Sequence, residues 1–581
     1  MSDFKLVNVV DSMIEDIQPE ISLPVISGVA SNTYMEFNSQ QANGNTQIQY
    51  NVTVPSIETV VAREFLMETA VRLRIDFDTT KDWAANQVLF SYGKTNSLQN
   101  FPVNSLFTTV QSNINNATVS VNSRQVMAPL LKMFNYRELA EYNSLCPSMP
   151  DSFYLNYADG IGSNNSALAN YSVGGYDKKY EPRGCFPVTL YDNTGLPLNS
   201  LEVKCDAAGK APYPFIYLDF KTTEPMMMLS PYISGSSNNK SGFIGINTLT
   251  ITANLGTADR CMSNASFGTK SGELVLSRTI SKVSLENYTS AKLLLQFKTP
   301  SVTMYSKIEP KSVVNYNQYE PYSYSSGVSI APKATQTLTF NSVQLNQIPS
   351  RILIFARKTT LDTYDSNSFM VINGTSINFA NKSGLLSTAN QQQLYQMSVR
   401  NGLQQSYYEY SGSGISNNSA GAPTSMPTIG SVLAIDPSLD LSIDAPYTNG
   451  SSGQFNLQFN VTVTNQGDDA ITPTLFLVVV NSGIFVTENG ASSYTTGLIN
   501  KEMVLETKVE DSVIDTDSYH KKVVGGSIEN LTSIHKHLKG AFSKASEIQK
   551  KIDNVGSGMS AGSMSAGDVQ GGIKRRIHKY A

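Results

Sequence analysis

The four histidines are the first residues to test for chemistry, and all of them fall in the last 62 residues of the 581-residue chain. They are His520, His535, His537 and His578, so residues 1–519 contain no histidine. A Ser-His-Asp or Cys-His nucleophilic site and a histidine zinc site are therefore excluded from the body of the chain. His535 and His537 are two positions apart and would point to different faces of a helix, which argues against a metal site there.

The other side chains that could react show no spacing that supports a reaction. The run Met226–Met228 follows Pro225 and is interpreted as core packing rather than a soft-metal site. Asp511, Asp515 and Asp517 lack the glycine and glutamate of a calcium-binding loop. The cysteines have no paired spacing and are expected to be reduced, buried thiols. They are Cys146, Cys185, Cys205 and Cys261.

Nucleotide-binding and zinc-binding motifs are also missing. The chain has no phosphate-binding loop, no dinucleotide glycine fingerprint and no zinc-type cysteine pair. Two distant carboxylates can still converge in a fold, as they do in glycosidases, so carboxylate chemistry stays open. We expect a protein that is not an enzyme and that has no catalytic residues, no cofactor and no metal site.

The carboxyl-terminal segment carries the one clear interaction signal. Apolar residues recur there every three or four positions, which predicts an amphipathic helix with a contact face. That face consists of Ile528, Leu531, Ile534, Leu538, Phe542, Ile548 and Ile552. A Gly/Ser-rich linker and a basic end follow. Lys574, Arg575, Arg576 and Lys579 could contact nucleic acid phosphates or lipid headgroups; a solvated basic terminus and a nuclear-import signal remain alternatives.

The net charge also distinguishes the carboxyl-terminal segment from the rest of the chain. Residues 520–581 hold 11 Lys or Arg against 4 Asp or Glu, a net charge of +7, which leaves −11 on the rest because the whole chain carries −4. An acidic body with a basic tail suggests two different environments.

The body repeats one order of elements. Gln344–Arg357 contains an apolar strand expected to be buried on both faces, and Ser387 or Thr388 could cap a short helix downstream. In the first half, Thr69–Phe77 alternates as a strand and a helical pattern spans Ser123–Phe134. Two further pairs of segments correspond: 217–230 with 432–442, and 246–256 with 455–467. The strand within Pro473–Val480 is expected to be central and buried.

These offsets of roughly 210 to 265 residues indicate a duplicated domain rather than a short-period array. The predicted fold is all-β: two tandem eight-stranded jelly rolls with short helices in loops and a carboxyl-terminal amphipathic helix. The predicted organisation is an arm at 1–45, for which an ordered first strand of the sandwich is the alternative, a first jelly roll at 46–300 and a second at 301–515. Residues 516–581 are assigned to the helix, linker and basic tail. A Gly/Asn/Ser/Tyr-rich insertion at about 135–214 is expected to form a projecting loop that could contact a receptor or a neighbouring subunit.

Neither a secretory signal nor a membrane-spanning run is present, so synthesis in the cytosol is expected.

The two halves resemble the double jelly-roll major capsid proteins of tailless double-stranded DNA viruses, in particular polinton-like viruses, adintoviruses and virophages. The resemblance rests on PSIETVVARE (55–64), EPMMMLSPY (224–232), QLNQIPSRILIFARK (344–358), LLSTANQQQLYQMSVRNG (385–402) and GSVLAIDP (430–437). It covers about residues 46–510, and its strongest part runs from Gln344 to Pro437. These motifs are typical of a fold and do not mark an active site.

This resemblance implies a homotrimer with a pseudo-sixfold outline, in which two jelly rolls per chain stand perpendicular to an icosahedral virion shell. It implies self-association into a capsid lattice, with penton and minor capsid proteins as further partners. The tail would face the interior and contact genomic DNA or an internal membrane; the host receptor stays unidentified. Assembly would be cytoplasmic or nuclear. The helical tail matches no shared motif of the family, so its role rests on charge alone.

Two other functions stay open. A carbohydrate-binding or adhesive β-sandwich, such as a fibre or lectin-like protein, would use exposed aromatic side chains near Asn and Asp, but a secreted adhesin should carry a signal. A glycosidase built on two carboxylates is the other alternative, and a glycan panel would test it.

Overall fold

The computed structural model describes most of the chain between residues 31 and 497. The described residues are 31–79, 82–152, 181, 183–232, 242–264, 267–270, 276–299, 311–358, 367–417, 422–441, 443, 449–467 and 469–497. They all belong to one compact unit that extends to Thr507. The predicted amphipathic helix, linker and basic tail lie outside the described residues.

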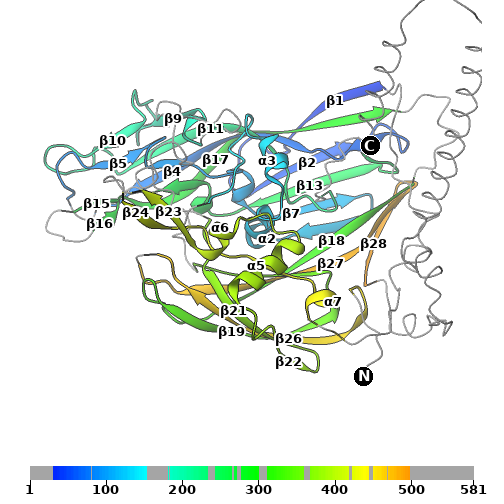
Figure 1. Ribbon diagram of the computed structural model, residues 1–581. Helices are drawn as coiled ribbons and strands as arrows, with labels where there is room; N and C mark the ends of the chain where they lie inside the picture. Colours follow the sequence, from blue (N-terminus) through cyan, green and yellow to red (C-terminus); the bar gives the residue numbers. More distant parts are fainter. Residues whose placement is uncertain are drawn as a thin grey trace, which may run out of the picture. The chain divides into compact units, whose positions relative to one another are not determined.

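Two antiparallel sheets form the first half of this unit (Figure 1). One sheet runs in the order β1 (Ser31–Asn38), β17 (Ile280–Thr299), β4 (Leu66–Phe77), β11 (Phe215–Pro225) and β9 (Val188–Tyr191), with the short strands β3 (Val60–Ala62) and β12 (Gly242–Phe243) added. The other runs in the order β2 (Gln47–Thr53), β13 (Thr248–Leu255), β7 (Phe107–Ile114) and β8 (Ala117–Val121). Every second side chain of β4 is buried, so its alternating sequence gives a strand with one core face and one outer face.

The second half repeats the two sheets. One runs in the order β18 (Lys311–Ser325), β27 (Pro473–Glu488), β20 (Arg351–Lys358) and β25 (Leu433–Ile435), and β28 (Ala491–Thr496) also pairs with β27. The other runs in the order β19 (Thr335–Gln347), β26 (Ser452–Thr464), β21 (Val371–Phe379) and β22 (Lys382–Leu385). The expectation for Pro473–Val480 is confirmed, because β27 lies between β18 and β20.

The two halves are equivalent strand by strand. In chain order, β1, β2, β4, β7, β8, β11, β13 and β17 take the sheet positions of β18, β19, β20, β21, β22, β25, β26 and β27. A helix follows the same strand in each half: α2 (Ser123–Leu131) follows β8, and α5 (Gln391–Arg400) follows β22. The predicted duplication and the double jelly roll are therefore confirmed.

Three sequence-based details need correction. Ser31–Asn38, which the prediction included in an arm at 1–45, forms β1 and pairs with β17, so the first jelly roll begins before residue 46. Asn390 caps α5 in place of Ser387 or Thr388. The helical pattern expected over Ser123–Phe134 begins at Ser123 as α2, which Asn122 caps, but the helix ends at Leu131. An Asn side chain caps as well as Ser does, and only the backbone conformation decides which of them does so.

The described parts of the insertion predicted at about 135–214 include strands that pair with neighbouring strands of the first jelly roll. It contains α3 (Tyr136–Ala140), η2 (Arg183–Cys185), β9 and β10 (Glu202–Lys204), and residues 153–180 and 182 lie outside the described residues. β9 joins β11, and β10 pairs with β5 (Val88–Ser91). Figure 1 shows β5 and β10 at the same end of the strands as the hairpins β15–β16 and β23–β24. These hairpins comprise β15 (Phe267–Thr269), β16 (Leu276–Arg278), β23 (Ser413–Asn417) and β24 (Pro423–Pro427).

The hydrophobic core has two parts, and β20 contributes to both. Ile352, Ile354 and Ala356 pack in the core between the sheets of the second jelly roll. Leu353 and Phe355 lie on the opposite face of β20. They belong to the hydrophobic cluster that also includes the core residues of the first jelly roll. This explains why the strand is apolar at successive positions: one face fills its own jelly roll and the other is covered by the neighbouring one.

Candidate functional site: the junction of the two jelly rolls

The predicted interaction residues of the tail lie outside the part of the chain that the structure describes. Lys574, Arg575, Arg576 and Lys579 lie outside the described residues. The same holds for the helix contact face of Ile528, Leu531, Ile534, Leu538, Phe542, Ile548 and Ile552. These assignments stay predictions.

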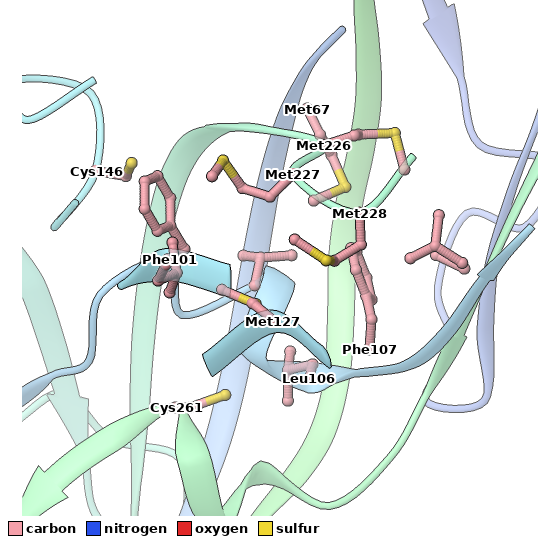
Figure 2. Packing of buried hydrophobic residues seen from close by; sticks show 14 of the residues in the cluster. Met67, Phe101, Leu106, Phe107, Met127, Cys146, Met226, Met227, Met228 and Cys261 are labelled. Carbon is pink, nitrogen blue, oxygen red and sulfur yellow. The ribbon is translucent and has the colours of Figure 1, made fainter. Parts of the chain in front are cut away.

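Sulfur-containing side chains of the body lie in the core. Figure 2 shows Met226, Met227 and Met228 packed with Met67 and Phe107. At most 9% of each of the three methionines is exposed, so the core-packing interpretation is confirmed. Cys146, Cys205 and Cys261 are buried, and Cys185 is half-buried. Within the described ranges, no group of His, Cys, Asp or Glu could hold a metal ion, and no helix is long and apolar enough to cross a membrane.

A buried carboxylate lies close to this cluster. The Glu224 carboxylate is fully buried and accepts hydrogen bonds from the Val103 and Asn104 backbone N–H groups at 2.9 Å each and from the Thr222 hydroxyl at 2.9 Å. These bonds satisfy the start of η1 (Asn104–Leu106). Burial nevertheless raises the pKa of Glu224, because the hydrogen bonds only partly offset the loss of solvation.

Glu224 is therefore expected to give the folding stability a specific pH dependence. The pKa is higher in the folded state, so the folded state holds more protons and stability falls as pH rises above about 4.5 toward that folded pKa. In Glu224→Gln this contribution disappears, and the wild type's stability advantage over the variant should shrink with rising pH, by at most about 1.4 kcal/mol per pH unit. Chemical denaturation of both proteins across that range measures the difference. An advantage that grows with pH would contradict the raised pKa.

The second jelly roll packs its β18–β27–β20–β25 sheet against the first. Phe355 of β20 stacks on Phe476 with ring centroids 5.1 Å apart and meets Phe369 edge-on at 5.5 Å. Val478 and Val480 of β27 belong to the same shared core. The junction is therefore apolar at its centre, which is typical of permanent interfaces.

Polar contacts surround this apolar centre. The Ile244 backbone N–H donates to the Ser312 hydroxyl at 2.9 Å, and the Thr487 hydroxyl donates to the Ile244 carbonyl at 2.6 Å. At the turn between β7 and β8, the Asn115 side chain donates to the Ser492 hydroxyl at 2.9 Å, and Asn116 accepts from the Ser492 N–H at 2.7 Å. Because three of these four contacts join a backbone group to a side chain across the junction, they fix the relative position of the two jelly rolls.

Asp151 is the centre of the buried charge network at the junction. Its carboxylate is 2.6 Å from the Arg183 guanidinium, and neither side chain is more than 3% exposed. The same carboxylate accepts from the Gln99 amide at 3.0 Å and from the Asn367 backbone N–H of the second jelly roll at 2.8 Å. The Lys132 ammonium donates to the Asp151 carbonyl at 2.5 Å. Asp151 therefore links the insertion, the end of α2 and the second jelly roll.

Arg357 continues this network from β20. Its guanidinium donates to the Asn367 side chain at 3.0 Å and lies over the Phe369 ring, 5.4 Å from the centroid. Burial, followed by the nearby Arg260 and Arg124 guanidinium groups, lowers the pKa of Arg357. The network can order the junction, but it contains no nucleophile with a base beside it. The role of this network is therefore structural rather than catalytic.

Gly430 gives a test of the close packing beside this junction. Its φ is +94°, and an added Cβ would lie 2.1 Å from the Phe369 carbonyl oxygen. Gly430→Ala is expected to cost about 1–3 kcal/mol for backbone strain and about 1–3 kcal/mol more for overpacking. Gly195→Ala is the matched control, because Gly195 has a φ of +90° but nothing within 4 Å of the added Cβ. Urea denaturation measures both. Equal losses in the two variants would show that the contact with Phe369 contributes nothing.

The outer face of β4 and β11 carries an ordered set of charged and aromatic side chains. Arg72 donates two hydrogen bonds of 2.7 Å to Asp219 and lies over Tyr191 and Tyr217, at 4.9 and 5.5 Å from their ring centroids. Arg74 lies 3.8 Å from the centroid of Phe215. Arginine and aromatic residues held in place in this way are typical of interface hot spots.

Sequence reasoning predicted the buried strands that hold Phe355, Val478 and Val480, but it identified neither the polar residues of the junction nor the outer-face residues. The alternation in Thr69–Phe77 could have placed Arg72 and Arg74 opposite the core face, because successive side chains of a strand point to opposite sides. No sequence signal could have identified Asp151, which lies 32 residues before Arg183 and 216 before Asn367.

Comparisons with known proteins agree over nearly the whole chain. A family model described as the first domain of the Sputnik virophage major capsid protein matches residues 2–298, and one described as the carboxyl-terminal domain of major capsid protein V20 matches residues 316–483. The chain is 24% identical over 556 residues to the putative capsid protein V20 of Sputnik virophage, a match that covers 93% of this chain and 86% of that protein.

Two solved structures share the fold. A chain of the Sputnik virophage structure determined by cryo-electron microscopy matches with a TM-score of 0.71 and 22% identity, covering 86% of this chain and 95% of that one. The mavirus major capsid protein matches with a TM-score of 0.64 and 16% identity, covering 88% of this chain and 99% of that one.

Proposed function

Because the chain belongs to the Sputnik virophage major capsid protein family, we propose that three copies form a capsomer with a pseudo-sixfold outline and that these capsomers tile the virion shell. The protein is a structural major capsid protein and a component of the virion, and its homologues are not enzymes. The lectin-like and glycosidase alternatives are therefore not carried further.

The trimer is supported by the equivalence of the two jelly rolls. Both halves have the same sheet order, and both belong to one compact unit. A ring of three such chains presents six similar domains, so it can occupy a hexagonal lattice position. Most oligomers have closed symmetry of this kind. A permanent trimer interface would exceed about 2,000 Å² of buried surface.

Light scattering of the purified protein tests the trimer. A species near three times 63.3 kDa with a hexagonal outline in negative-stain images is expected. A monomer at micromolar concentration would overturn the trimeric capsomer, although it would leave the family assignment intact.

The carboxyl-terminal tail is proposed to face the virion interior, where its charge suits DNA phosphates or lipid headgroups. This part rests on the net charge of +7 in residues 520–581. Penton and minor capsid proteins are proposed as neighbours in the shell, and assembly is proposed to take place in the host cytoplasm or nucleus.

Deleting residues 525–581 is expected to lower the DNA content of assembled particles or to impair their assembly. The variant with Lys574, Arg575, Arg576 and Lys579 all changed to Ala isolates the basic end. If these residues bind DNA, the salt dependence of binding should weaken by about 0.9 in the log–log slope for each lost phosphate contact. Unchanged assembly and DNA content after the deletion would refute the interior role, and an unchanged slope in the four-residue variant would exclude DNA as its ligand.

A further inference from the structure

Three arginine side chains lie close together where α2 of the first jelly roll contacts the second. Arg124 belongs to the first turn of α2, and Arg260 ends η3 (Ala258–Arg260). The Arg260 guanidinium donates a hydrogen bond of 2.5 Å to the Arg124 carbonyl, which joins these two elements. Arg357 comes from β20 of the second jelly roll. It lies two residues after Phe355 and therefore on the side of the strand that faces the first jelly roll. We name Arg124, Arg260 and Arg357 the triple-arginine cluster.

The carboxylates of the described residues compensate only part of this positive charge. Asp259 accepts two hydrogen bonds of 3.1 Å from the Arg124 guanidinium. Asp151 is the other carboxylate whose charge acts on Arg357, but it already pairs with Arg183. Three positive charges against the single negative charge of Asp259 leave a net charge of +2 within the described part of this region.

The pKa values of the arginines show the same imbalance. Burial, followed by the charge of Arg124, lowers the pKa of Arg260 to about 10, and Asp259 acts in the opposite direction. The charges of Arg260 and Arg124 add to the effect of burial on Arg357. Arginine keeps its proton in proteins, so these charges persist at neutral pH and require a counter-charge.

Three buried hydrogen-bond donors in the same place have no partner among the residues that the structure describes. They are the Nε–H groups of Arg260 and Arg357 and the hydroxyl of Ser123, which directly precedes Arg124. Arg357 is only 2% exposed, and Ser123 is fully buried. Buried donors without a partner are uncommon, and a bound ion or water is a usual explanation. Water can accept these hydrogen bonds, but only an anion also compensates the charge.

We propose that the triple-arginine cluster binds one small oxyanion of the phosphate or sulfate type between the two jelly rolls. The planar guanidinium group presents its donors in a fork that matches the oxygen atoms of such an anion. The start of α2 adds positive potential, because the N-terminus of a helix attracts anions. The anion would contact both jelly rolls, since Arg357 belongs to the second and the other two arginines belong to the first.

The degree of burial decides which form of the ligand fits. Arg357 is too deeply buried for the backbone of a nucleic acid to reach, so the ligand is a free anion. Arg124 keeps 27% of its side-chain surface exposed and gives the anion access from solvent. The site lies within a single chain, so this inference does not depend on the trimer proposed above.

A ligand that binds only the folded state stabilises it by mass action. Sodium phosphate is therefore expected to raise the Tm of the full-length wild type above its value in sodium chloride of equal ionic strength. The matched ionic strength separates binding from general screening of charges. Arg357→Gln should lose this difference between the two salts, whatever the Tm of the variant itself. A wild-type Tm that is the same in both salts would contradict a phosphate site.

Isothermal titration calorimetry measures the affinity. The dialysed wild type is expected to bind one phosphate per chain, and any phosphate that acid denaturation releases from the dialysed sample counts as already bound. Arg357→Gln should weaken binding about 10-fold to 100-fold, the effect of losing a hydrogen bond to a charged group. Arg400→Gln is the control, because it removes the same charge from a side chain that is 75% exposed and lies outside the cluster. This variant should bind phosphate as the wild type does.

Selenate locates the site without any variant. It has the charge and shape of sulfate, and anomalous scattering identifies its selenium in crystals of the wild type. Its oxygen atoms are expected about 2.7–2.9 Å from Arg260 Nε and Arg357 Nε, as in charge-assisted hydrogen bonds. No selenium between these two groups at 10 mM selenate would overturn the inference. So would a dialysed protein that neither binds nor releases phosphate, or equal losses of affinity in Arg357→Gln and Arg400→Gln.

Discussion

Replacing Asp151 with Asn should destabilise the folded unit by about 3–5 kcal/mol, which is typical when one partner of a buried ion pair is removed. The change leaves the Arg183 guanidinium, which is only 3% exposed, without its carboxylate. It also places an amide where the carboxylate accepts from the Gln99 side chain and the Asn367 backbone N–H, and an amide nitrogen cannot accept a hydrogen bond. The expected loss of stability is large because the Arg183 and Gln99 donors stay buried.

The comparison variant is Glu202→Gln. Glu202 pairs with Lys204 at 2.6 Å, but a quarter of its side chain and half of that of Lys204 are exposed. Solvent screens this pair, so the expected loss is within about 1 kcal/mol. Thermal unfolding of both variants under conditions that keep the chain monomeric measures the difference. Similar small losses in both would mean that water or another group compensates Arg183 at the junction.

Replacing Phe355 with Ala should remove about 3–5 kcal/mol of stability, as truncation of a buried Phe does. Phe355 is fully buried and packs on Phe476 and Phe369, and such aromatic pairs add about 0.5–1.5 kcal/mol beyond their buried area. The damage should be located at the junction of the two jelly rolls, because this side chain faces the first jelly roll.

Ile354→Ala provides the contrast, since Ile354 is the next residue on β20 and faces the core of its own jelly roll. Hydrogen exchange distinguishes the two variants. Phe355→Ala should raise exchange at junction amides such as Asn367 N–H and Gln404 N–H, which bond to Asp151 and Lys132. Ile354→Ala should raise exchange mainly in β19, β21 and β26. Identical exchange patterns would refute the assignment of two separate faces to β20.

The sequence was sufficient for the fold class because local periodicity encodes it. The alternation in Thr69–Phe77 predicts β4 with its core face, since strand side chains point alternately to two sides. The uninterrupted apolar run at Ile352–Ala356 predicts a strand buried on both faces. The same order of strands and one helix in both halves indicated the duplication, and the absence of histidine before residue 520 excluded histidine-based catalysis in the body.

Sequence patterns were less informative at the ends of elements. Ser387 and Thr388 are both plausible caps, and yet Asn390 accepts the capping hydrogen bond of α5. Residues 31–38 fall within the arm predicted at 1–45 because the sequence there is a polar stretch that follows Pro19 and Pro24, whereas their backbone hydrogen bonds to β17 make them a strand.

Only the tertiary structure decided which surfaces meet. Leu353 and Ile354 are equally apolar in the sequence, and the packing of the two jelly rolls alone assigns one to the junction and the other to the inner core. Arg72 donates a hydrogen bond to Asp219, and these residues are 147 positions apart in the sequence. Asp151 accepts a hydrogen bond from Asn367, and these residues are 216 positions apart. Such pairs depend on the register of strands and on the docking of whole domains. A periodicity that extends over a few residues fixes which side of a strand is apolar, but it contains no information about what that side will contact.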